Sequence, residues 1–145
     1  MEVTGACQCG KITFKANARS GEAELCHCAM CRRAVGNIHM TSLAARKDAV
    51  SWSGRPKTYA SSPIAKRAFC GDCGTPLFFA YNDSEFMDLM VGAIDQTEAL
   101  RPGSHFGVES RLEAFRRLDG LREERTSDND RIVSLWIDAT GHPPT

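Results

Sequence analysis

The sequence predicts a mainly β fold with short helices only. Apolar and polar residues alternate along several short runs, and Gly or Pro residues separate many of these runs, which is the pattern of strands joined by turns. No long stretch repeats its apolar residues at helical spacing. The 145 residues, 42% of them hydrophobic, are enough for one domain with a single core.

Residues 11–18 show the alternation clearly. Ile12, Phe14 and Ala16 share one side of this run, and polar residues separate them, so we expect a strand. The other segments that we expect to be extended are 23–25, 37–43, 50–52, 59–63, 65–69, 77–81 and 105–108. The run 86–94 is among the most apolar, and we expect it to be a central strand of the sheet.

Helical signals are few. Residues 31–36 predict one short helical turn that ends at Gly36, and apolar residues three positions apart predict a helix at 110–118. Arg101-Pro102-Gly103 predicts a turn.

The last part of the chain differs in composition from the rest. We expect one domain over residues 1–120, and a linker with a C-terminal extension of unknown role over 121–145. The charged stretch at 121–131 lacks apolar periodicity. The isolated apolar run at 132–137 predicts a last strand that docks on the sheet.

Charge and hydropathy exclude several classes of protein. Lys plus Arg and Asp plus Glu number 18 each, so no global positive field favours nucleic acid or an anionic membrane. No run approaches the length of a membrane span, and the N-terminus lacks the pattern of a signal peptide. We therefore expect a cytoplasmic protein. The sequence leaves the oligomeric state open, with a homodimer as one option.

The seven cysteines are confined to three clusters: Cys7-x-Cys9, Cys26-x-Cys28-x-x-Cys31 and Cys70-x-x-Cys73. Disulfides do not persist in a reducing compartment, and an odd count leaves one sulfur unpaired. Closely spaced thiolates are ligands that suit zinc. The clusters therefore predict metal sites, with Zn²⁺ as the expected ion.

Four plus three is the natural division of these sulfurs, because a closed structural zinc site takes four protein ligands and a reactive site keeps three. The closed site would consist of Cys7, Cys9, Cys70 and Cys73. Cys26, Cys28 and Cys31 would hold a second zinc with one open position, which makes two ions per chain. Spacing alone also permits another division, in which Cys26 and Cys28 join Cys70 and Cys73.

The triplet predicts chemistry on sulfur. Three thiolates leave a bound Zn²⁺ with a net negative charge, so simple hydrolysis is disfavoured. An incoming thiol suits the open position better and would lie near an electrophile. Arg32 and Arg33 adjoin the triplet and can offset its charge or hold a substrate carboxylate, although both also fit solvated surface positions. We expect His27 to point away from the metal.

Together the motifs resemble those of the glutathione-dependent formaldehyde-activating enzyme (GFA) family, which also includes centromere protein V-like zinc proteins. The resemblance covers residues 3–118. Its motifs are Gly5-x-Cys7-x-Cys9-Gly10, Cys26-His27-Cys28-x-x-Cys31-Arg32, Phe69-Cys70-x-x-Cys73-Gly74 and Pro102-x-x-His105. Phe115 departs from the family pattern, in which a tryptophan is common at this position.

The resemblance implies a zinc-binding β-tent fold for residues 1–120, with the same four-plus-three division of the cysteines. It also implies a carbon–sulfur lyase, similar to S-(hydroxymethyl)glutathione synthase, that joins a thiol such as glutathione reversibly to an aldehyde such as formaldehyde. Cys26, Cys28 and Cys31 would hold the catalytic zinc, and Arg32 and His105 are the further site candidates. The expected partner is a small-molecule thiol or its aldehyde adduct.

Two other functions stay open at this point. In one, both zinc ions are structural and the chain is a non-catalytic protein-binding module. In the other, the chain is a zinc finger that binds nucleic acid, which the balanced charge disfavours.

Overall fold

The longest strand, β4 (Met40–Ser53), joins the parts of a nine-stranded sheet. The computed structural model describes residues 1–144. On one edge, the first residues of β4 pair with β3 (Glu22–Cys26) and later residues pair with β2 (Thr13–Ala18). On the other edge β4 pairs with β8 (Phe86–Met90). The sheet therefore divides at β4.

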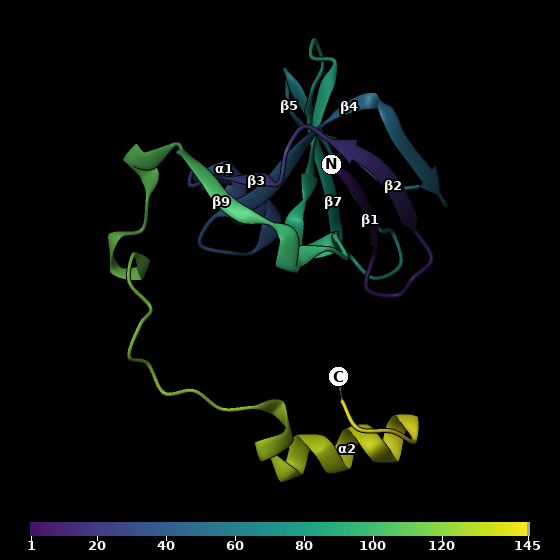
Figure 1. Cartoon of the computed structure of the whole chain (residues 1–145), viewed down its shortest axis with the longest axis vertical. Helices are drawn as coiled ribbons and strands as arrows, with labels where there is room; N and C mark the ends of the chain where they lie inside the picture. The colour runs from purple at the N-terminus through teal and green to yellow at the C-terminus, as the bar shows by residue number, and fades with distance from the viewer. Residues whose placement is uncertain (145) are drawn as a thin grey trace. The chain divides into compact units, whose positions relative to one another are not determined.

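The main path of the sheet runs β1-β2-β4-β8-β7-β6-β5, and its strand pairs are antiparallel. The remaining strands are β1 (Glu2–Ala6), β5 (Lys57–Ser62), β6 (Ala65–Phe69), β7 (Pro76–Tyr81) and β9 (Arg101–Phe106). β9 pairs with β3 in parallel. Figure 1 shows β1 and β2 on one side of β7, and β3 with β9 on the other. This architecture confirms the predicted mainly β fold class.

Successive residues of a strand point to opposite faces of the sheet, and here both faces are buried. The larger cluster contains Leu43, Leu77 and Leu89, each 1% exposed or less. Complete burial of such a side chain is worth roughly 1.5–3 kcal/mol. The smaller cluster, on the other face, consists of Cys26, Cys31, Met40, Ala65, Phe79 and Met90. This second face carries the candidate site.

The helix α1 (Ala29–Val35) confirms the predicted helical turn. Cys28 is its N-cap, because the Cys28 sulfur accepts a hydrogen bond from the N–H of Cys31. Gly36 ends the helix at φ 64°, a left-handed conformation that glycine adopts without strain. Cys28 and Cys31, two of the three clustered cysteines, therefore stabilise the first turn of α1.

Three local predictions differ from the structure. Residues 101–103 form the start of β9 instead of a turn, because β9 lies along β3 with Arg101 opposite Glu22. The run 86–94 is central, but its strand ends at Met90 and the 3₁₀-helix η1 (Val91–Ala93) follows. Residues 110–118 form no α-helix; they contain the short 3₁₀-helix η4 (Glu113–Phe115) and the end of η3 (Val108–Ser110).

The chain divides into two compact units, Met1–Glu113 and a second that begins at Ala114. In the second unit, η5 (Thr126–Asp128) precedes the helix α2 (Asp130–Thr140). The strand expected at 132–137 was wrong, because the Asn129 side chain caps α2 by accepting the N–H of Ile132 and the helix satisfies its own backbone. No helix among residues 1–144 combines the length and apolar character needed to cross a bilayer.

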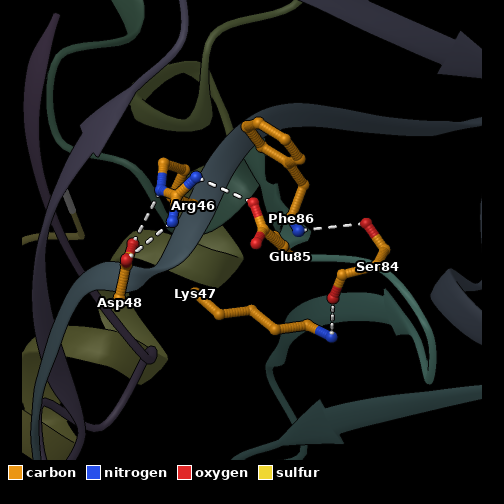
Figure 2. A network of polar contacts seen from close by, with 6 residues as sticks. All are labelled: Arg46, Lys47, Asp48, Ser84, Glu85 and Phe86. Atoms are coloured by element: carbon orange, nitrogen blue, oxygen red, sulfur yellow. Dashed lines mark hydrogen bonds and ion pairs between the residues drawn. The ribbon is translucent and has the colours of Figure 1, made fainter.

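A polar network fixes the register of β8 against β4 (Figure 2). Arg46 of β4 binds both Asp48 and Glu85, at 2.8 Å and 2.9 Å. The Lys47 ammonium donates to the backbone oxygens of Tyr81 and Ser84. Arg46, Asp48 and Glu85 are exposed and each ion pair contributes little by itself, but together with the Lys47 hydrogen bonds they hold the turn that leads into β8.

Candidate metal centres and the adjoining pocket

The cysteines of the first and the third sequence clusters lie close together in the structure. The sulfurs of Cys7, Cys9, Cys70 and Cys73 all lie within 4.8 Å of one another. Cys7 and Cys70 are buried, at 3% and 1% exposed. Because the two pairs lie more than sixty residues apart in the printed sequence, a metal ion on these sulfurs would connect distant strands.

The two turns that carry these sulfurs have matching geometry. Gly10 and Gly74 have φ of 73° and 78°, and each donates its N–H to the carbonyl of the first cysteine of its turn, Cys7 or Cys70, at 2.9 Å. No neighbouring atom lies within 4 Å of a Cβ built at either glycine. These glycines are therefore required by backbone conformation and not by close packing.

Side chains connect the two turns as well. The Gln8 N–H donates to Oγ1 of Thr75 at 3.0 Å, and Lys11 pairs with Asp72 at 2.8 Å. The Thr75 hydroxyl lies 3.2 Å from the Cys73 sulfur. Hydrogen bonds from the Thr75 side chain and then its backbone lower the pKa of Cys73 to about 5, which favours the thiolate that a metal requires.

The remaining three cysteines form a second cluster, separate from the first. The sulfurs of Cys26, Cys28 and Cys31 also lie within 4.8 Å of one another. Cys26 ends β3, and the other two belong to the first turn of α1. In residues 1–144, no fourth Cys, His, Asp or Glu ligand atom joins this group at that distance.

The donor chemistry of the triplet fits a metal cation. Burial, as the largest cause, raises the pKa of Cys26 to about 12 and also raises that of Cys31. Against burial, the backbone N–H of Cys31 helps to lower the pKa of Cys28. Three converging sulfurs of which two resist ionisation are stabilised as thiolates when a cation lies among them. The residues present therefore suit a bound Zn²⁺.

Arg67 of β6 is the positive group that contacts this cluster. Its side chain is 4% exposed. Nη2 donates to the Cys31 sulfur, Nη1 to the Met40 sulfur, and Nε to the Ser61 hydroxyl, each at 3.2 Å. The guanidinium also lies 4.6 Å from the centre of the Phe79 ring. Its position is thus fixed by four partners.

A cavity of about 400 Å³ adjoins the triplet. Cys26, Cys28 and Cys31 line it together with Arg67. Its apolar walls consist of Met30, Ile64, Phe79, Tyr81 and Phe106. A smaller cavity of about 110 Å³ lies near Tyr59 and Phe78 and contains none of the triplet cysteines. The larger of these two is the candidate substrate pocket, because the triplet cysteines line it.

Two carboxylates also line this pocket, Glu24 of β3 and Asp88 of β8. Glu24 is exposed and Asp88 is partly buried. Burial, followed by the charge of Glu24, raises the pKa of Asp88 to about 6, while Arg67 opposes the shift. Burial and then Asp88 raise the pKa of Tyr81. The pocket therefore combines one fixed cation with acidic groups.

The histidines lie outside this pocket. His27 is buried, at 6% exposed, and its Nε2 lies 2.9 Å from Nδ1 of His105. The ring centres of His27 and His39 are 5.6 Å apart. Burial and then the charge of Arg111 lower the pKa of His27. The structure therefore places His105 against His27, behind the cysteine turn, and not among the pocket-lining residues.

Arg32 and Arg33 lie in α1 on a different, shallower surface. They line a hollow of about 410 Å³ with Ala29 and Asn37, and neither lines the pocket beside the cysteines. The Nε atom of Arg32 is buried and has no hydrogen-bond partner within the described part of the chain. The arginine that contacts the triplet is Arg67.

Gly107 holds the backbone of β9 close to Cys28. It has φ 63°, and a Cβ at this position would lie 3.0 Å from the Cys28 nitrogen and 3.2 Å from the Cys28 Cβ. Any side chain at this position would therefore press on Cys28, one of the three clustered cysteines. Sequence reasoning assigned this glycine no role.

Arg67 and Asp88 are the two pocket residues that sequence reasoning missed. Each is a charged residue on the inward side of an apolar strand, Arg67 between Ala65 and Phe69 and Asp88 between Phe86 and Met90. A buried charge is seldom tolerated without a partner or a function. A charged residue at an inward position of an apolar strand was therefore the feature of the sequence that could have drawn attention to these two positions.

A family model matches most of the chain. Residues 2–110 match the family described as glutathione-dependent formaldehyde-activating enzyme. A Schizosaccharomyces pombe protein named as an uncharacterized lyase is 37% identical over 84 residues, which cover 58% of this chain and 61% of that protein. The chain thus matches about three fifths of the length of that curated relative.

A solved structure has a similar fold. The crystal structure of a Rhodobacter sphaeroides protein, a structural genomics target, aligns with a TM-score of 0.59 and 22% identity. The alignment covers 70% of this chain and 98% of that one. At this identity the likeness concerns the fold alone.

Proposed function

The chain belongs to the glutathione-dependent formaldehyde-activating enzyme family, and from this premise we propose that it is a zinc-dependent carbon–sulfur lyase. The reaction is the reversible addition of a small thiol of the glutathione type to an aldehyde of the formaldehyde type. The seven free cysteines support action in a reducing compartment such as the cytoplasm. Residues 1–120 form the catalytic zinc domain in this proposal, and residues 121–145 are an extension.

One observation carries the proposal: three sulfurs converge beside a cavity of about 400 Å³, and the described chain supplies no fourth ligand there. Cys26, Cys28 and Cys31 would hold the zinc. When bound, the zinc would supply a position that keeps an incoming thiol as its thiolate. The cysteines at the other centre, Cys7, Cys9, Cys70 and Cys73, would hold a second zinc that only stabilises the fold.

In this proposal Arg67 compensates charge at the site, and its other contacts keep it in the position to do so. Its charge, 3.2 Å from the Cys31 sulfur, compensates part of the negative charge that thiolates place at the site. Its contacts with Ser61, Met40 and the Phe79 ring hold it in that position. Arg67 is therefore a positioning residue for the sulfur ligands. Arg32 and His105, the candidates taken from the sequence, would act only indirectly, because neither lines the pocket.

The apolar pocket walls favour the addition of the thiol to the aldehyde over the addition of water. Met30, Ile64 and Phe106 present apolar surface around the sulfurs, and such walls reduce the number of water molecules near a bound aldehyde. Phe79 and Tyr81 extend this surface, with their rings 4.9 Å apart. A thiol with an accessible sulfur and a small carbonyl compound fit a cavity of about 400 Å³.

Exchange NMR tests the proposal. The exchange rate between glutathione, formaldehyde and their adduct without protein is the reference, and the zinc-loaded protein should increase that rate at catalytic concentration. Cys28→Ser should abolish the increase while the protein stays folded. If the fully zinc-loaded wild type leaves the rate unchanged, this activity is excluded and the non-catalytic zinc module becomes the better account.

A further inference from the structure

Asp88 lies in a row of residues that leads from the metal cluster across the floor of the pocket. Arg67 of β6 is opposite Phe79 of β7, and Phe79 is opposite Asp88 of β8. Directly opposed residues on neighbouring strands have side chains on the same face. Arg67 contacts Cys31 at one end of the row, and Asp88 lines the same cavity at the other end.

The Asp88 carboxylate has no hydrogen bond or ion pair in the part of the chain that the structure describes, although Arg67 interacts with it electrostatically. The three kinds of donor nitrogen on Arg67 are directed to Ser61, Met40 and Cys31. A partly buried carboxylate without a close cation holds a proton more readily than one in water. Burial and Glu24 accordingly raise its pKa to about 6.

The addition of a thiol to an aldehyde requires a group that moves one proton. The S–H bond of the thiol breaks, the sulfur forms a bond to the carbonyl carbon, and the π electrons of C=O move to oxygen. The oxygen then takes up a proton, so the net reaction neither consumes nor releases protons. One carboxylate can perform both transfers.

We propose that Asp88 is the proton carrier of this reaction. Its carboxylate accepts the thiol proton at Oδ, and the resulting carboxylic acid donates that proton to the aldehyde oxygen as the S–C bond forms. In the reverse direction the carboxylate takes the hydroxyl proton of the adduct and returns it to the departing sulfur. This role rests on the lyase function proposed above and adds a catalytic residue to it.

The other groups that face Asp88 suit the role less well. Tyr81 on the neighbouring strand has a pKa that burial and Asp88 raise, so it keeps its proton near neutral pH. Arg67 cannot accept a proton. Glu24 is exposed to solvent, where water competes with substrate for its oxygens. Cys26 and Cys31 are assigned to the metal. Asp88 alone among these groups is both sheltered and able to change protonation near pH 6.

The test compares Asp88→Asn with Asp48→Asn in the full-length zinc-loaded protein, with glutathione and formaldehyde as probes. Asn keeps the shape of Asp but carries no transferable proton. Asp48 is an exposed residue of β4 that pairs with Arg46 and does not line the pocket, so Asp48→Asn controls for the loss of a carboxylate outside the site. We expect Asp88→Asn to reduce the catalysed exchange rate about 100-fold and to abolish the acid limb of the pH profile, with the zinc content retained and the thermal midpoint no lower than that of the wild type. Asp48→Asn should leave the rate unchanged.

The outcomes separate this inference from the proposed function. If the wild type accelerates exchange and Asp88→Asn matches it from pH 5 to pH 8, the lyase function stands and the role of Asp88 is wrong. A variant that only raises KM and keeps the wild-type pH profile also overturns the role. If the wild type itself gives no acceleration, both proposals fail. Titration of the Asp88 carboxyl by ¹³C NMR in the wild type provides a readout without any variant: a pKa in the ordinary aspartate range contradicts the role.

Discussion

The guanidinium of Arg67 donates a hydrogen bond to the sulfur of Cys31 at 3.2 Å, although 36 positions separate these residues. This contact connects β6, which leads into the four-cysteine centre, with the helix that carries the three-cysteine centre. The strand that leads to Cys70 of the four-cysteine cluster thus also carries a cation that contacts the three-cysteine cluster. One strand therefore links the two clusters.

Replacement of Arg67 tests this link. Arg67→Lys keeps the charge but loses the planar fork that reaches three acceptors, so we expect the free energy of unfolding to fall by about 1–3 kcal/mol and the exchange rate to fall as well. Arg46→Lys is the control, because Arg46 makes exposed ion pairs and should cost about 0–1 kcal/mol. Denaturant unfolding measures both. Equal losses in the two variants would contradict a special role for Arg67.

Gly107 and Gly36 have nearly the same φ, so their alanine variants can be compared directly. Both have positive φ, 63° and 64°, but only Gly107 lies against Cys28. Gly36→Ala should cost about 1 kcal/mol, the strain of a left-handed alanine. Gly107→Ala should cost more and also weaken zinc binding at the triplet, because its Cβ displaces Cys28. Zinc titration with a chelating indicator measures the affinity; an unchanged affinity in Gly107→Ala would show that the close approach has no influence on the site.

The raised pKa of Asp88 predicts how the free energy of unfolding changes with pH. Its pKa is about 6 in the fold and 3.8 as the reference value, so between these values the folded chain binds more protons than the unfolded chain. The free energy of unfolding therefore falls as pH rises through this window. Asp88→Asn lacks this effect and should gain stability relative to wild type, on the order of 1–2 kcal/mol by pH 7, after allowance for partial exposure.

Paired urea melts at pH 4.5 and pH 7.5 give this difference, and the comparison with wild type cancels the pH dependence of the cysteines. A gap between variant and wild type that does not change with pH would mean that Asp88 titrates as an ordinary surface aspartate.

The division of the cysteines into four and three was predicted from coordination chemistry, because spacing alone also permitted Cys26 and Cys28 to join Cys70 and Cys73. The helical turn could be predicted because its end at Gly36 is a local backbone signal. The turn predicted at Arg101-Pro102-Gly103 was wrong for another reason. These residues pair with β3, and that pairing outweighs the local turn pattern. A last strand was predicted at 132–137, where α2 forms instead through its own backbone hydrogen bonds and the Asn129 cap.

Arg67 and Asp88 could be noticed in the sequence as charges in apolar runs but could not be assigned to the site, because only the order of the strands shows that they line one pocket. Each is a single charged side chain in an apolar run, and only the pairing of β6, β7 and β8 brings them to one pocket. The sequence placed one site candidate, Arg32, next to a cysteine motif in the chain and the other, His105, in a separate motif. The structure places other residues next to the three-cysteine cluster in space.

The four-cysteine centre should determine stability. Cys73→Ser removes one of four ligands that connect the start of the chain with β6 and β7, so much of the metal-binding free energy is lost from folding. We expect the variant to unfold or to lose several kcal/mol. Cys28→Ser should retain the fold, because Cys26, Cys31 and Arg67 keep their buried contacts. Circular dichroism during heating compares the two, and an equal collapse of both would remove the distinction between a structural and an open centre.

The metal content of wild type and Cys28→Ser tests the central claim most directly. Purified under the same conditions and measured by mass spectrometry of the elements together with native protein mass, the wild type should contain two zinc ions per chain. Cys28→Ser should contain one and keep its far-ultraviolet spectrum. One ion or none in the wild type, or the loss of both ions from a folded Cys28→Ser, would contradict the division into a closed and an open zinc centre.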